Sequence, residues 1–173
     1  MKANKQTNKS DSSIELLTSI LLNYPVINTV NINLEERELE ISFLVEDPIT
    51  DISWEEVQDY LMCNFNLFNK LQKRDRDLIK FQIIKESYSD LSKISLVRNL
   101  NKLSQQEMDF MIKLIKETFG EKLLENQLYD QNLSFDLAES IDGMLAQIEQ
   151  LEYREKYLGF REEDRILVFN KNK

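Results

Sequence analysis

The stretch VNINLEERELEISFLV, residues 30–45, decides the fold class of this chain. Val30 and Ile32 alternate with asparagines, and the alternation resumes over residues 39–45 after a polar break. Apolar side chains at every second position share one side of a β-strand, and a polar break between two such runs is typical of a hairpin. We therefore predict an antiparallel hairpin with one buried face over residues 30–45.

Three helices are predicted around this hairpin from apolar residues that recur every three or four positions. A capping box, in which a serine side chain and a glutamate three residues later each bond to the other's backbone, marks each start. The three pairs are Ser12 with Glu15, Ser53 with Glu56, and Ser104 with Glu107. We expect the first helix to end near Pro25, the third to end at Gly120, and residues 1–11 to form a loose polar tail.

Further strands complete the predicted sheet. Period-two patterns predict a second hairpin over residues 78–85 and 93–99, and a short apolar run predicts a last strand over residues 166–169. The order of elements predicts an α+β fold in a single domain, residues 12–170. Its antiparallel sheet would consist of two hairpins, with the C-terminal strand as an addition, and would carry helices on one face.

The C-terminal third predicts more helix. Residues 121–129 are interpreted as helical, and a long final helix is expected from Ser134 to about Tyr157, where Gly159 would stop it. Its apolar residues alternate spacings of four and three, the rhythm of a coiled-coil seam: Leu137, Ile141, Met144, Ile148 and Leu151. This seam packs either inside the domain or against a partner protein, which includes a second copy in a homodimer.

The composition excludes several classes of protein. The chain has 173 residues, of which 42% are hydrophobic and 31% charged, the balance of a globular protein. It contains no histidine, the commonest general base and zinc ligand, and only three glycines, too few for the familiar phosphate-binding loops. We therefore expect no catalytic triad, no catalytic residue and no cofactor.

The single cysteine, Cys63, bears on the compartment. One cysteine cannot form a disulfide within the chain, which suits a reducing environment. No run of about 18 apolar residues is present, so no segment is expected to span a bilayer. We expect a cytoplasmic protein with no membrane segment, in which Cys63 is a half-buried structural thiol.

A group of carboxylates before the second helix is a candidate metal site. It includes Asp47, Asp51 and Glu55, and hard cations such as Mg²⁺ and Ca²⁺ prefer carboxylate oxygens. The ordered spacing and central glycine of a calcium loop are missing, and acidic residues in a first helical turn also interact favourably with the helix dipole. A carboxylate-based, metal-dependent enzyme is therefore kept as an alternative hypothesis.

Charge is distributed unevenly along this acidic chain, whose net charge is −9. Residues 70–102 carry 9 basic and 4 acidic side chains. The candidate phosphate contacts are Lys70, Lys73, Arg74, Arg76, Lys80, Lys93, Arg98 and Lys102. A structural explanation competes, because Glu38 and Glu40 of the first hairpin would face Lys80 and Lys93 if the two hairpins were neighbours. We favour this explanation, since the overall negative charge repels nucleic acid.

Together these patterns predict a small, non-catalytic protein-interaction or regulatory module. A protein partner is favoured over nucleic acid. The alternatives are a nucleic-acid- or ribosome-associated factor that uses residues 70–102, and the metal-dependent enzyme.

Overall fold

A computed structural model describes residues 7–46, 51–126, 140–152 and 154–172, with the backbone alone for residues 7–11 and 51–52. Within them, six antiparallel strands form one open sheet in the order β3-β4-β2-β1-β5-β6. The strands are β1 (Thr29–Asn33), β2 (Glu38–Glu46), β3 (Phe81–Ser87), β4 (Leu91–Asn99), β5 (Lys156–Glu162) and β6 (Arg165–Asn170). The helices are α1 (Thr7–Asn23), α2 (Asp51–Leu71), α3 (Gln105–Phe119) and α4 (Ile141–Glu149), with 3₁₀ turns η1 (Arg76–Leu78) and η2 (Gly120–Lys122). The predicted α+β fold class is confirmed.

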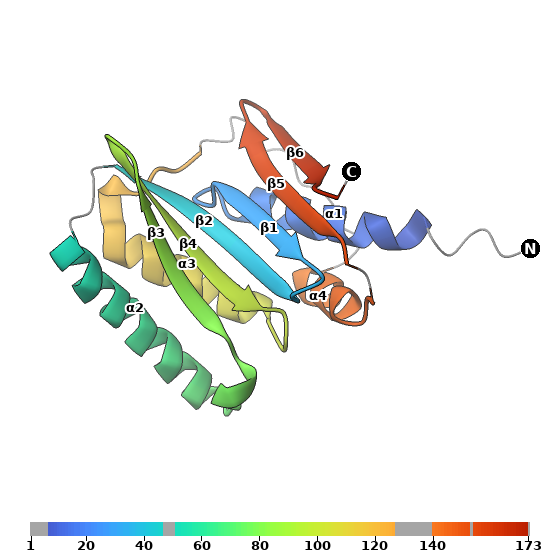
Figure 1. Cartoon of the computed structure of the whole chain (residues 1–173), viewed down its shortest axis with the longest axis horizontal. Coiled ribbons are helices and arrows are strands. Elements are labelled where there is room, and N and C mark those ends of the chain that lie inside the picture. The colour runs from blue at the N-terminus through green and yellow to red at the C-terminus, as the bar shows by residue number, and fades with distance from the viewer. Residues whose placement is uncertain (1–6, 47–50, 127–139, 153, 173) are drawn as a thin grey trace, which may run out of the picture.

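The helices lie on one face of the sheet, and the other face is uncovered (Figure 1). α1, α3 and α4 lie behind the sheet, while α2 runs along its β3 edge. Phe65 of α2 stacks on Phe81 of β3 with ring centroids 3.7 Å apart, which holds the helix to this edge. One cluster of buried apolar side chains fills the space between the helices and the sheet.

The first hairpin forms as predicted, with one buried face. Val30 lies opposite Ile41 and Ile32 opposite Leu39, and all four side chains are buried beneath the helices. The second hairpin, β3–β4, is also present, and β4 pairs with β2 in the middle of the sheet. Period-two patterning therefore located both hairpins correctly.

Only one of the three predicted capping boxes marks a helix start. The Ser104 side chain accepts a hydrogen bond from the Glu107 N–H at 3.2 Å and caps α3, which ends at Gly120 with φ 54°. The prediction for Ser12 is wrong because α1 begins at Thr7, and the Ser12 hydroxyl donates instead to Gln147 of α4 at 3.0 Å. The prediction for Ser53 is also wrong, since α2 begins two residues earlier.

The C-terminal third differs most from the prediction. After η2 ends at Lys122, Leu123 forms a β-bridge with Val45 in place of the helix expected over residues 121–129, of which 127–129 lie outside the described residues. α4 is short, capped by Ser140, and ends at Glu149. Ser134, the expected cap, lies outside the described residues.

A strand replaces the end of the predicted long helix. β5 pairs with β1 and with β6, which confirms the predicted last strand and adds one before it. Gly159 lies in the middle of β5 rather than ending a helix. A β-carbon there would lie 3.2 Å from Leu21 Cδ1 and 3.4 Å from Leu17 Cβ, so glycine lets α1 approach the strand closely.

The predicted coiled-coil seam faces the interior. Ile141, Met144, Ile148 and Leu151 are buried in the core, in the layer that α4 forms with α1, and Leu137 lies outside the described residues. Of the two interpretations of this seam, packing inside the fold accounts for the four described side chains. In the described part of the chain, no helix is both long enough and apolar enough to cross a membrane.

Candidate interaction surfaces

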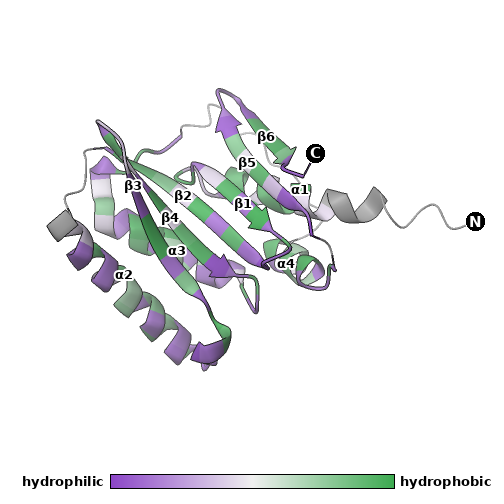
Figure 2. Cartoon of the chain, viewed as in Figure 1, coloured by the Kyte–Doolittle hydropathy of each residue, from purple (hydrophilic) through white to green (hydrophobic). Residues whose placement is uncertain are grey.

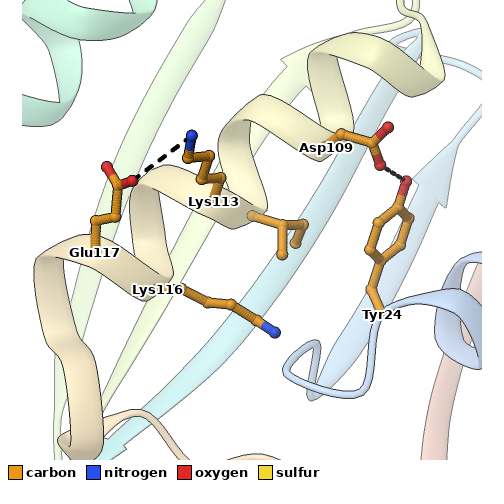
Figure 3. Close-up of a pocket in the computed structure, with 6 residues that line it drawn as sticks. Tyr24, Asp109, Lys113, Lys116 and Glu117 are labelled. Atoms are coloured by element: carbon orange, nitrogen blue, oxygen red, sulfur yellow. Dashed lines mark hydrogen bonds and ion pairs between the residues drawn. The ribbon is translucent and has the colours of Figure 1, made fainter.

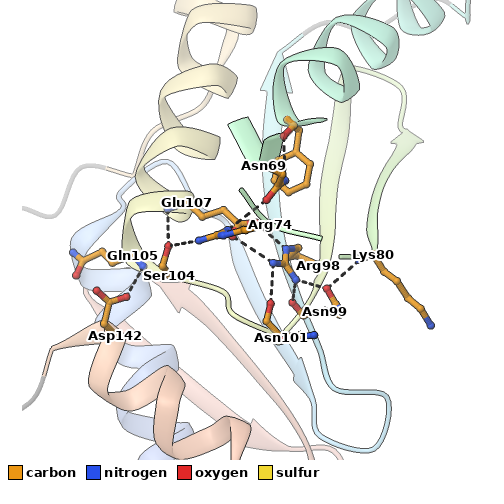
Figure 4. A network of polar contacts seen from close by, with 11 residues as sticks. Asn69, Arg74, Lys80, Arg98, Asn99, Asn101, Ser104, Gln105, Glu107 and Asp142 are labelled. Carbon is orange, nitrogen blue, oxygen red and sulfur yellow. Dashed lines mark hydrogen bonds and ion pairs between the residues drawn. The ribbon is translucent and has the colours of Figure 1, made fainter. Parts of the chain in front are cut away.

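A buried ion network joins the sheet to α2 and α3 (Figure 4). The Arg98 Nε of β4 donates to Glu107 Oε1 at 2.8 Å, and Arg74 donates to the other oxygen of the same carboxylate. Arg98 is 1% exposed and Glu107 is fully buried. Arg98 also donates to the backbone carbonyl of Asn101 at 3.0 Å, and Arg74 to the Ser104 hydroxyl at 3.1 Å. The charges of Arg74, Arg98 and Glu107 are therefore all paired, and they join β4, α3 and the segment after α2.

This network removes two cations from the predicted basic surface. Arg74 and Arg98 bind Glu107, a residue from outside the basic segment. Lys93 pairs with Glu86 of β3 at 3.0 Å. Burial lowers the pKa of Lys93, but the hydrogen bond and charge of Glu86, with the charge of Glu40, outweigh it and raise that pKa.

The expected pairing between the two hairpins is wrong in its register. Asn99 lies opposite Glu38 and Val97 opposite Glu40, so neither lysine of the second hairpin directly faces a glutamate of the first. Internal neutralisation nevertheless occurs, through Glu107 and Glu86.

Five cations of the segment remain exposed at one end of the molecule. They are Lys70, Lys73, Arg76, Lys80 and Lys102. Lys70 lies in the last turn of α2, and two neighbouring connections, α2–β3 and β4–α3, carry the other four. Asn99 joins these connections, because it donates to the Leu78 carbonyl at 2.7 Å and accepts from the Lys80 N–H at 3.1 Å. We call these five residues the basic end.

A shallow hollow of about 370 Å³ lies beside α3 (Figure 3). The Tyr24 hydroxyl donates to Asp109 at 2.5 Å, and Lys113 lies 3.9 Å from Glu117. Burial, with the hydrogen bond and charge of Asp109, raises the pKa of Tyr24 well above its ordinary value. The hydroxyl therefore stays protonated as a hydrogen-bond donor and is unsuited to act as a base.

The uncovered face of β5 and β6 is apolar. Its outward side chains are Leu158, Phe160, Leu167 and Phe169, which we call the β5–β6 patch. The rings of Phe160 and Phe169 stack with centroids 5.7 Å apart and an interplanar angle of 13°. β6 is accordingly among the strands coloured most hydrophobic in Figure 2.

The opposite side of this hairpin is largely apolar as well, with Arg161 as its one charged residue. Tyr157 is buried, and Ile166 and Val168 pack against the core. A solvated face of an antiparallel sheet normally carries polar residues, so a hairpin whose outer face is apolar departs from the usual alternation. The centre of the uncovered face is different, with Thr29, Ser42 and Ser95 in one row across β1, β2 and β4.

The outer edge of β6 is open in the part of the chain that the structure describes. The Lys171 N–H donates to the Lys156 carbonyl at 2.7 Å, and alternate residues of an antiparallel strand bond to the same neighbour. The backbone groups of Ile166, Val168 and Asn170 therefore point away from β5, toward the free edge.

α2 exposes a second apolar surface. Tyr60, Leu67 and Leu71 are 48%, 53% and 72% exposed, and Cys63 between them is exposed too, which corrects the expected half-buried thiol. We call these four residues the α2 stripe. The helix buries Leu61 and Phe65 on its other side. The sequence pattern missed the stripe because α2 carries apolar residues on both sides.

The candidate metal residues are only partly described. Glu55 is exposed on α2, the side chain of Asp51 is not among those described, and Asp47 lies outside the described residues altogether. Among the described side chains, no group of three acidic or cysteine residues is placed to hold a metal ion.

Comparison of the chain with protein-family models, with curated proteins and with solved structures gives no match. Function must therefore be argued from the surfaces themselves.

The Glu107→Gln variant tests the buried ion network. Removing one charge of a buried pair leaves the remaining charge uncompensated, so we expect the free energy of unfolding to fall by about 3–5 kcal/mol. Glu117→Gln on the same helix is the control, since its exposed pair with Lys113 is worth about 0.5 kcal/mol or less. Urea denaturation measures both variants, and equal losses would contradict a special role for Glu107.

The Tyr24→Phe variant tests the raised pKa. Above pH of about 10, the unfolded chain ionises at this position while the folded chain keeps the proton. Below this pH, the free energies of unfolding of the wild type and Tyr24→Phe should differ by a constant amount. Above it, the free energy of unfolding of the wild type should fall relative to that of Tyr24→Phe by at most about 1.4 kcal/mol per pH unit. Denaturant unfolding at a series of pH values checks this, and a difference that stays constant above pH of about 10 would contradict it.

Proposed function

We propose that this chain is a non-catalytic protein-binding module of the cytoplasm, which takes an extended segment of its partner as an additional strand beside β6. The observation that carries the proposal is an edge strand, apolar on both faces, whose outer backbone groups have no hydrogen-bond partner among the described residues. Edge strands of stable proteins are normally shielded by charges, bulges or covering elements. An unshielded edge is the structure that β-strand addition requires.

The two edges of the sheet support this choice. β3 carries Lys85 and Glu86 and has α2 alongside it, so its edge is guarded. β6 begins with Arg165 and then presents four apolar residues in succession. A partner strand beside β6 would satisfy the open N–H and C=O groups, and its side chains would cover the β5–β6 patch.

The rim of the patch has the composition of a protein interface. Lys156, Glu162 and Arg165 surround the apolar residues at the two ends of the hairpin. An apolar centre with a polar rim of both signs is typical of surfaces that bind proteins reversibly. We therefore expect the partner segment to be apolar in its middle and to carry charges at its ends.

The Phe169→Ser variant tests the patch. Phe169 is 49% exposed, and Ile84 on the opposite edge strand is 44% exposed, so Ile84→Ser is a matched control. Tagged proteins would be captured from native lysate after nuclease treatment, and their partners measured by quantitative mass spectrometry. We expect Phe169→Ser to lower recovery of a stoichiometric partner at least about tenfold, equivalent to about 1.4 kcal/mol, and Ile84→Ser to leave it unchanged.

Two results would count against this site. Full recovery of the partner with both variants would mean that the β5–β6 patch does not contact it. Equal loss of the partner with both variants would mean that binding is not specific to the β6 edge of the sheet.

A second candidate function is nucleic-acid binding at the basic end. The gathering of five exposed cations from the end of α2 and from two connections favours it, although Asp75 and Asp77 lie in the same segment. When a protein neutralises phosphates of a single strand, the logarithm of its binding constant falls linearly with log[salt]. The slope is about −0.7 for each phosphate neutralised.

The double variant Lys80→Gln, Lys102→Gln tests this candidate. If the basic end binds phosphates, the variant should bind a single-stranded RNA oligonucleotide more weakly. The slope of the logarithm of its binding constant against log[salt] should also be shallower by about 0.7 for each phosphate that is no longer neutralised. Fluorescence anisotropy at several salt concentrations measures both quantities. Lys93→Gln is the control, because Lys93 is already paired with Glu86. Unchanged affinity in the double variant would eliminate the basic end as a binding site.

A further inference from the structure

The α2 stripe is exposed apolar surface that the packing of this chain does not use. Its residues follow one another at spacings of three and four, which places them on one side of the helix, opposite Leu61 and Phe65. α2 has 21 residues and is therefore about 31 Å long. Exposed apolar surface of this kind marks an interaction site when it is contiguous and has a polar rim.

The charges beside the stripe indicate what covers it. Glu56 and Asp59 lie on the outward side of the N-terminal half of α2, and Lys70 lies on the same side in the last turn. The charge on this surface thus changes from negative to positive along the helix. A second helix with the same pattern, laid antiparallel, would place each acidic half over a basic half.

We propose that two copies of this chain form a homodimer in which their α2 helices pack antiparallel through the α2 stripe. A twofold axis near residues 64 and 65 brings Asp59 of each copy to Lys70 of the other and packs Tyr60 against the leucines of the second stripe. The contact is isologous, so it closes as a dimer and leaves no surface for further copies. A parallel arrangement would place Asp59 beside Asp59 and Lys70 beside Lys70.

This dimer does not depend on the function proposed for β6. α2 lies at the β3 end of the sheet, and β6 is the strand at the other end. Both β6 edges remain open in the dimer, so either proposal can fail while the other stands.

The first test is the molar mass in solution. Light scattering on the full chain, between about 1 µM and about 1 mM, should approach twice the 20.6 kDa of one chain. Leu67→Asp should keep the monomer mass over this range, and it should fold normally because Leu67 is 53% exposed. Ile84→Asp is the control and should dimerise like the wild type.

The second test is a charge exchange that only the antiparallel arrangement can rescue. Asp59→Lys and Lys70→Asp should each weaken the dimer at least about tenfold, because each places like charges together. The double variant should restore wild-type affinity in the antiparallel dimer, whereas in a parallel dimer it would remain as repulsive as before. A monomer mass for the wild type at every concentration, or a Leu67→Asp variant that still dimerises, would overturn the proposal. A double variant no tighter than the single ones would overturn its antiparallel geometry.

Discussion

The carboxylate of Glu107 is the point on which the arrangement of this fold depends. It lies in the first turn of α3, fully buried, and accepts hydrogen bonds from Arg98 of the central strand β4 and from Arg74 after α2. Transferring such charges out of water costs several kcal/mol for each ion, and only complete hydrogen bonding offsets this. The donors on Arg98 that do not reach Glu107 bond to the carbonyl groups of Asn99 and Asn101. Because two arginines from different parts of the chain share this one buried carboxylate, the network ties the end of α2 and the start of α3 to the central strand.

The same residue explains why the sequence could place α3 but not its function in the fold. Ser104 and Glu107 have capping-box spacing, and Ser104 does cap the helix. Glu107, however, uses its side chain for two arginines from other elements. Spacing within a segment reveals local hydrogen bonds, whereas partners 9 and 33 residues away become visible only when the chain has folded. Counting charges over residues 70–102 therefore overestimated the free positive surface.

Elements with strong local patterns were predictable, and elements chosen by packing were not. The hairpins β1–β2 and β3–β4 alternate with period two, so their existence followed from the sequence. β5 contains Gly159 in a run of residues that also suits a helix, and only the fold shows it as a strand, on which α1 packs so closely that a β-carbon at Gly159 would crowd Leu21 and Leu17. For α2, the periodicity identified a helix but could not tell its inward side from its outward side. The stacking of Phe65 on Phe81 makes that choice, and it leaves Tyr60 and Leu67 in solvent.

The two edge strands of the sheet, β3 and β6, differ in what lies beside them. At the β3 end, α2 runs along the strand, and the cation–π contact of Lys85 with Trp54, 5.8 Å from the ring centroid, adds to the Phe65–Phe81 stack. At the β6 end, Arg165 is the only charged residue of the strand. An open, apolar edge invites pairing with any extended chain, which proteins usually avoid. The contrast between this edge and the β3 edge, which has a helix and charged side chains beside it, supports the proposal that β6 accepts a partner strand.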